Sequence, residues 1–130
     1  MDKRTMMEEW FTVTEQDLKS AKFLKKMHPA PLEVICYHCQ QSAEKYLKGY
    51  MILQGEKVMR THDLVVLNKK CRKYNDDFVK IEDECLRLTD YGVNVRYPFH
   101  FDLTKADMEL AIKDIDKIKE LVLQKVRENN

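Results

Sequence analysis

One stretch, residues 32–53, constrains the fold more than any other part of the chain. Its sequence is LEVICYHCQQSAEKYLKGYMIL. Apolar residues recur in it every three or four positions, which is the repeat of one face of an α-helix. The opposite face carries His38, Gln41, Glu44, Lys45 and Lys48. Because a helix of about 20 residues spans about 30 Å, the length of a small domain, we expect a central helix against which the others pack.

Three further segments show the same periodicity. Residues 2–28 predict a first helix, and Pro29 and Pro31 oppose its continuation. Residues 75–89 predict another helix, and a last one follows a cap at Asp102 or Thr104. The inward-facing stripe expected for the first helix is Met6, Trp10, Val13, Ala21, Leu24 and Met27.

A shorter segment fits between the central helix and residue 75. Gly55 is the better terminator of the central helix, although Gly49 also lies near its end. Thr61 or Asp63 can then cap a short helix that ends at Cys71. No stretch predicts a strand, and only three glycines and three prolines occur. The sequence therefore predicts one domain over residues 1–130, an all-α antiparallel up-and-down four-helix bundle with one short extra helix.

Charge and hydropathy narrow the class of function. Charged residues make up 35% of the chain but nearly cancel, to a formal charge of +1. That balance excludes a global basic field as a nucleic-acid signature and leaves room for a local basic patch. The N-terminus lacks an apolar run of the signal-peptide type, and no apolar run is long enough to span a bilayer. We therefore expect a cytoplasmic protein with no membrane association.

The cysteines do not indicate a metal site. Cys36 and Cys39 form a CxxC, but it lies inside the central helix and no second close pair of ligands follows. A buried free thiol is the usual role for such residues. We expect no metal and no cofactor.

The segment YGVNVRYPFHFD, residues 91–102, has no helical period and carries Arg96 and His100. Arginine is a permanently charged fork that suits phosphate, and histidine can transfer a proton near neutral pH. RNA cleavage without a metal needs such groups, a base and an acid for the two oxygens and a cation for the charged phosphorane. The alternative is that Arg96 pairs with an acidic neighbour and His100 is an ordinary loop residue.

Two further sets of residues are open to a functional and a structural interpretation. Lys45 and Lys48, with Gln41 and Glu44 beside them, can form a phosphate-contacting strip or a solvated helix face. Asp17 interrupts the stripe of the first helix, and a buried carboxylate must be paired or hydrogen-bonded. It can orient a histidine or lysine of a site, or it can tie two helices together.

The set CYHCQQSAEKYLKGYMILQGE, then THDL, then VRYP before a last helix resembles the HEPN domain family over nearly the whole chain. The resemblance implies a four-helix bundle that pairs as a homodimer. Many members of that family are partnered with a minimal nucleotidyltransferase in a toxin–antitoxin pair. Some are metal-independent endoribonucleases, and others are nucleotide-binding modules.

The family's nuclease motif is an arginine and a histidine separated by four to six residues at the start of the last long helix. The matching positions are Arg96 and His100, with three residues between them and Tyr97-Pro98 after the arginine. The resemblance thus implies that Arg96, Tyr97, Lys45 and Lys48 bind nucleotide or RNA phosphate. Cleavage by Arg96 and His100 is the alternative, and a non-catalytic interaction module is the third hypothesis.

Overall fold

The structure, a computed structural model, describes residues 2–92 and 102–129, and within these ranges it is helical throughout with no strand. The helices are α1 (Lys3–Leu24), α2 (Leu32–Leu53), α3 (Leu64–Arg72), α4 (Glu82–Thr89) and α5 (Lys105–Glu128), with 3₁₀ turns η1 (Asp76–Ile81) and η2 (Asp90–Gly92). The predicted all-α fold is confirmed.

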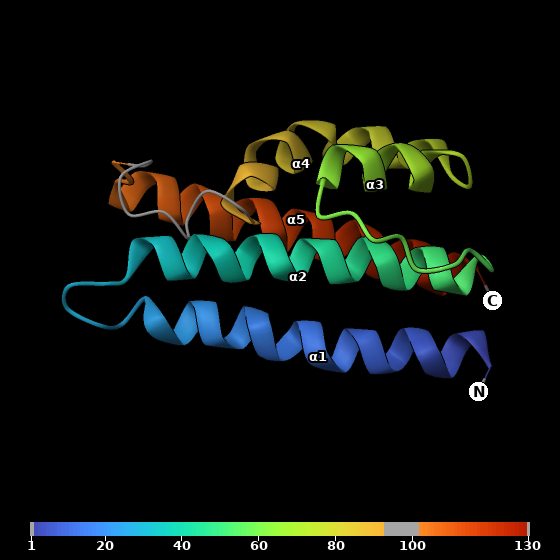
Figure 1. Ribbon diagram of the computed structural model, residues 1–130, viewed down its shortest axis with the longest axis horizontal. Coiled ribbons are helices and arrows are strands. Elements are labelled where there is room, and N and C mark those ends of the chain that lie inside the picture. The colour runs from blue at the N-terminus through green and yellow to red at the C-terminus, as the bar shows by residue number, and fades with distance from the viewer. Residues whose placement is uncertain (1, 93–101, 130) are drawn as a thin grey trace.

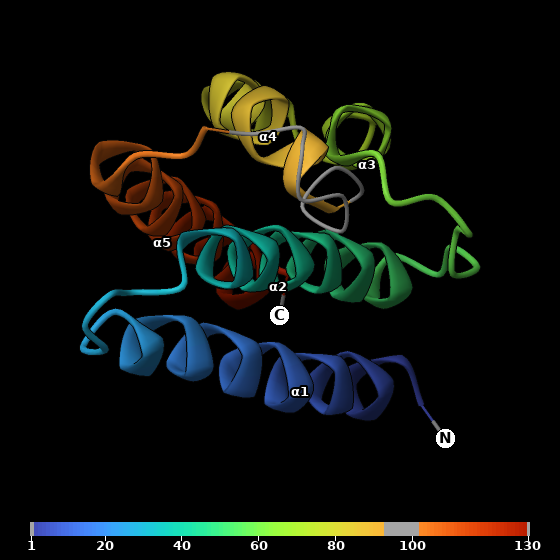
Figure 2. The ribbon, with the colours of Figure 1, turned by 60° about the vertical axis from the view of Figure 1, so that its left-hand side comes forward.

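Helix α2 lies at the centre of the molecule, as its sequence predicts. In Figure 1, α1 lies against one side of α2, while α3 and α4 form an outer pair on the other side, and α5 runs beside α2 in the middle layer. Successive helices α1, α2, α4 and α5 alternate in direction, which is the up-and-down arrangement (Figure 1). Figure 2 shows α3 and α4 side by side above α2 and α5. The helix caps agree with the sequence analysis, since Asp63 caps α3 and Thr104 forms a capping box with Asp107 on α5.

Helix α1 presents a different face to the core from the one predicted. Met7 and Leu18 are buried, each 2% exposed, whereas Met6 and Val13 lie at the surface and Val13 is 49% exposed. Two apolar stripes run along this helix about one position apart, and the register of packing against α2 decides between them. The prediction that Met6 and Val13 face the core is therefore wrong.

The region predicted as one helix over 75–89 divides in two, η1 and then α4. The carbonyl oxygen of Phe78 accepts a hydrogen bond of 2.9 Å from the Asn68 side-chain amide. The backbone N–H of Glu82, which an α-helix would direct to that oxygen, donates instead to Val79. A tertiary hydrogen bond thus favours the tighter 3₁₀ turn before α4 begins.

The close approach of α1 to α2 depends on Gly49, which lies within α2 rather than at its end. A Cβ atom on this residue would come within 2.5 Å of the Phe11 ring. Helix α2 continues to Leu53, and Gly55 follows it with a φ of 91°, a backbone conformation that favours glycine. None of the described helices is both long and apolar enough to cross a membrane.

Candidate functional site

The predicted site residues fall into two groups. Arg96, Tyr97 and His100 lie in residues 93–101, outside the described residues. Asp17, Gln41, Glu44, Lys45 and Lys48 are described, and they lie on α1 and α2. The described part of the predicted site therefore lies on α1 and α2.

A group of four polar side chains lies along α2 where the chain enters α3; we call Gln40, Glu44, Lys48 and His62 the α2 polar cluster. The two oxygens of Glu44 have different partners. Lys48 Nζ donates to Oε2 at 3.0 Å, and His62 Nδ1 lies 2.9 Å from Oε1. The Glu44 and Lys48 side chains are only 7% and 6% exposed, whereas that of His62 is 63% exposed. The Glu44–Lys48 ion pair is therefore buried. Of these three side chains, only that of His62 is largely exposed to solvent.

Gln40 connects the α2 polar cluster to the end of η2. Its side-chain amide donates to the His62 carbonyl oxygen at 3.0 Å, and Gln41 Nε2 donates to Gln40 Oε1 at 2.8 Å. A Cβ atom built on Gly92 would lie 2.5 Å from Gln40 Cδ, so only glycine permits this approach. The segment that carries Arg96 therefore leaves the described fold beside the α2 polar cluster.

Lys45 points away from the α2 polar cluster and joins α2 to α1. Its ammonium group contacts Asp17 Oδ2, and His38 Nδ1 lies 3.8 Å from Asp17 Oδ1. His38 Nδ1 is buried and has no hydrogen-bond partner among the described residues. Asp17 thus ties α1 to α2 and also lies beside a histidine. Lys45 further lines an open groove with Glu9, Trp10 and Val13.

Lys45 and Lys48 therefore do not form one solvent-facing strip. Each is paired with its own carboxylate, and Glu44 and Lys48 are buried rather than solvated. Sequence reasoning did not assign Gln40 or His62 to the site, although both lie in motifs that carry the family resemblance. The sequence signal was the presence of both a QQ and an HDL motif. It indicates a contact only once the fold places α2 beside the start of α3.

The cysteines behave as core residues. All four are buried, and none forms a disulfide. Burial raises the pKa of the Cys36 and Cys85 thiols to about 12. In the described part of the chain, no three His, Cys, Asp or Glu side chains gather in a group that could hold a metal ion.

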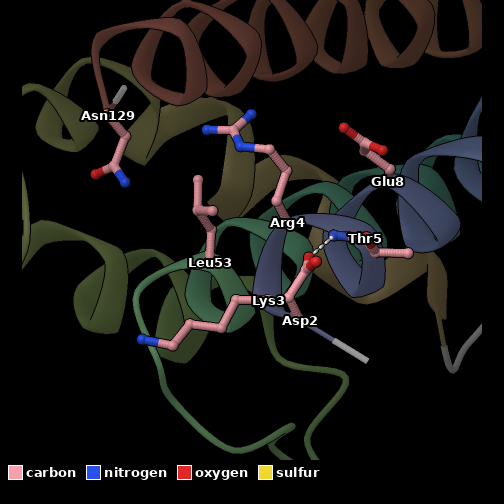
Figure 3. Close-up of a pocket in the computed structure, with 7 residues that line it drawn as sticks. All are labelled: Asp2, Lys3, Arg4, Thr5, Glu8, Leu53 and Asn129. Carbon is pink, nitrogen blue, oxygen red and sulfur yellow. Dashed lines mark hydrogen bonds between the residues drawn. The ribbon is translucent and has the colours of Figure 1, made fainter.

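A second groove, which the sequence did not predict, lies where the start of α1 meets the ends of α2 and α5. Figure 3 shows its lining residues, which are Asp2, Lys3, Arg4, Thr5, Glu8, Leu53 and Asn129. Arg4 and Lys3 extend in different directions there, so their charges are not focused on one point (Figure 3). Asp2 accepts the Thr5 backbone N–H at 2.7 Å as the cap of α1, which accounts for its position structurally.

The fold and the α2 polar cluster define a small all-helical bundle domain with a polar site beside its central helix. Residues 7–126 match the sequence profile of the HEPN domain. The chain belongs to the HEPN domain family.

Relatives and solved structures agree with this assignment. A candidate toxin, MJ1304 of Methanocaldococcus jannaschii, is 28% identical over 130 residues, covering 88% of this chain and 84% of that protein. The crystal structure of TT1696 from Thermus thermophilus has the same fold, with a TM-score of 0.79 at 22% identity. That of ST0689, an archaeal HEPN homologue, gives 0.73 at 24% identity. Each of these two structural comparisons covers 92% of this chain and 97% of the other.

Proposed function

We propose that this HEPN domain binds the phosphate groups of a nucleotide or of RNA, with Arg96 as the principal ligand and Tyr97 beside it. The observation that supports this most directly is the contact of Gly92 with Gln40, because it starts the Arg96 segment next to the α2 polar cluster. An arginine fork can hold two phosphate oxygens at once, which an ammonium group cannot do.

Lys48 and Lys45 have supporting roles in this proposal. Each ammonium group has three donors, and Glu44 or Asp17 engages only part of that capacity. Glu44 holds Lys48 in position and Asp17 holds Lys45, while Gln41 donates to Gln40 of the α2 polar cluster. The phosphate therefore adds to an existing ion pair instead of replacing it.

A titration with ATP and with a short RNA at two salt concentrations tests the proposal. We expect salt-sensitive binding that Arg96→Ala removes, because the fork supplies the main phosphate contact. Arg127→Ala is the matched control, since it removes the same charge from the exposed end of α5. Equal affinities of the two variants, or no salt-sensitive binding by the original protein, would refute the proposal.

We further propose that the domain works in the cytoplasm as a homodimer, as a toxin-like component paired with a minimal nucleotidyltransferase. The support is membership of the HEPN family and the similarity to a candidate toxin. Sedimentation equilibrium of the pure protein tests the dimer, and a mass of one chain at every concentration would contradict it. Co-expression with a neighbouring nucleotidyltransferase tests the pairing. A copurified partner with no effect of nucleic acid would favour the third hypothesis, a non-catalytic interaction module.

The second candidate function is metal-independent endoribonuclease activity, favoured by the toxin-like relative and by the firmly capped start of α5 close after His100. In this reaction His100 would accept the proton of the 2′-hydroxyl as its oxygen bonds to phosphorus, and would return that proton to the 5′-oxygen as the P–O5′ bond breaks. Arg96 would stabilise the charged phosphorane between these two events. Incubation with RNA in EDTA tests it. Cleavage that His100→Ala abolishes would support the activity, and intact RNA would reject it.

A further inference from the structure

Residues 57–73 are strongly basic, whereas the chain as a whole is nearly neutral. They contain one acidic residue, Asp63, and six basic ones, a local charge of +5 in a chain whose formal charge is +1. We call these six the α3 basic face: Lys57, Arg60, Lys69, Lys70, Arg72 and Lys73.

Few ion pairs among the described residues involve the α3 basic face, although Asp76 lines the same groove as three of its cations. The Asp63 carboxylate is occupied as the cap of α3, where its Oδ1 accepts the Val65 N–H at 2.9 Å. Arg72 makes one long contact of 3.6 Å with Glu82, and both of these side chains are partly exposed. No other cation of the face takes part in an ion pair with a described residue.

Tertiary contacts bring the two halves of this face together. The Tyr74 hydroxyl donates to Glu56 Oε1 at 2.5 Å, so the connection after α2 lies beside the end of α3. Figure 2 shows that connection running alongside α3 at the outside of the molecule. Lys57 follows Glu56 and Lys73 precedes Tyr74, so these two cations flank the contact in the sequence. Lys69, Arg72, Lys73 and Asp76 line a shallow groove on the same surface.

The dipole of α3 does not explain the whole face. Cations in the last turn of a helix are stabilised by its negative end, which accounts for those at residues 70–73. Lys57 and Arg60 precede the helix, where the dipole gives cations no support. Like charges at positions i and i+3 or i+4, such as Lys69 with Arg72 and Lys73, also destabilise the helix. An external polyanion would relieve this repulsion.

We propose that the α3 basic face binds the phosphodiester backbone of single-stranded RNA, through cations other than Lys45 and Lys48. A cationic groove bordered by an exposed aromatic ring is the arrangement that tracks a single strand, because phosphates meet the cations and a base stacks on the ring. Tyr74, which follows the groove residue Lys73 in the chain, is 40% exposed. The face thus adds an RNA contact made by residues of the described structure, and the inference rests on the proposed function in taking RNA as the ligand.

The test compares the double variant Lys69→Gln/Lys73→Gln with Lys19→Gln/Lys113→Gln, which removes the same charge from exposed positions on α1 and α5. Fluorescence anisotropy with a labelled single-stranded RNA of about 16 nucleotides, the upper site size of a single OB fold, measures affinity at several salt concentrations. We expect the slope of log K against log salt to fall by about 1.4 in the first variant only, since each single-strand phosphate contact contributes about 0.7. Circular dichroism confirms that both variants are folded.

Three results would overturn the inference. They are equal losses in both double variants, an unchanged slope in the first, and equally tight binding of polyglutamate, which would indicate an acidic protein partner instead. Single-stranded DNA of the same sequence shows whether the 2′-hydroxyl matters, and preference for DNA would also count against it. Arg96→Ala, measured alongside, separates the two proposals, because it affects the proposed function and leaves the loss caused by Lys69→Gln/Lys73→Gln in place.

Discussion

At the scale of single residues, Glu44 is a carboxylate that the fold buries. Its carboxylate is buried between the Lys48 ammonium group and His62, and Gln40 Nε2 approaches the same carboxylate at 3.4 Å. Desolvation of two charges is costly, so such a pair is tolerated only while both partners are present. Removing either charge alone leaves the other buried without compensation.

Glu44→Gln should therefore destabilise the fold by about 3–5 kcal/mol, the usual effect of breaking a buried pair. The double substitution Glu44→Leu/Lys48→Met, which removes both charges, should be close to neutral in stability. Urea unfolding measures both free energies. A double variant as unstable as Glu44→Gln would show that the pair itself, and not the unpaired ammonium group, accounts for the loss.

The buried thiols support a second prediction at this scale. Burial raises the pKa of Cys36 to about 12, and the other three cysteines are shifted in the same direction. Because the thiolate is the reactive form, none of the four should react rapidly with a disulfide reagent at about pH 8 in the folded protein. All four should react once urea unfolds it. Fast reaction of even one thiol in the native state would contradict the packing around α2.

At the scale of elements, the sequence predicts where helices lie better than how they face one another. The bounds of α2 and the cap of α5 agree with the sequence because periodicity and capping residues are local signals. The register of α1 was wrong because Met6 and Met7 are equally apolar, and only α2 decides which one is buried. The Gln40–Gly92 contact could not be predicted from the sequence either, because the two residues are distant in the chain. The same holds for the pairing of Lys45 with Asp17 of α1, which directs it away from Lys48.

Glu15 is the residue through which three elements meet. Its Oε1 atom on α1 accepts from the Tyr46 hydroxyl of α2 at 2.6 Å and contacts Lys119 Nζ of α5 at 2.5 Å. Burial raises the pKa of this carboxyl, but the hydrogen bonds from Lys119 and Tyr46 outweigh it and hold the pKa below its ordinary value of 4.5.

The stabilisation from Glu15 should depend on pH in a definite direction. A lowered pKa in the folded state means that the contribution is present above about pH 4.5 and is lost as the pH falls through the folded-state pKa. Glu15→Gln should lower the melting temperature at neutral pH and reduce the loss of stability on acidification. Melting curves across the acid range measure this, with Glu120→Gln, an exposed residue of α5, as the control. Parallel pH profiles for the original protein and Glu15→Gln would disprove the linkage.

At the scale of the whole molecule, α5 is joined by ion pairs to the helices on both of its sides. Lys22 of α1 pairs with Asp116 at 2.9 Å, and Arg87 of α4 makes two hydrogen bonds to Asp114, at 2.8 and 2.9 Å. Asp114 is buried, and the paired arginine keeps its charge over a wider pH range because this contact raises its pKa. Asp114 is thus one of the points at which α4 is tied to α5, together with the pair between Lys117 and Glu84 at 2.8 Å.

Asp114→Asn should weaken the outer layer more than the rest of the molecule, by about 2 kcal/mol, the scale of hydrogen bonds to a charged group. Native-state hydrogen exchange should show amides of α3 and α4 opening faster while those of α1 keep their protection. Asp116→Asn, at the exposed pair, is the control and should change little. Uniform acceleration across all helices would mean that the layers open only together.

The contact between Gly92 and the Gln40 carboxamide limits how this protein can be re-engineered. A loop transplanted from another member would have to begin with a residue that has no side chain, or be accompanied by a smaller residue at position 40. Directed evolution of ligand preference should therefore vary positions beyond 92. Positions 40 and 92 should be kept unchanged or be changed together.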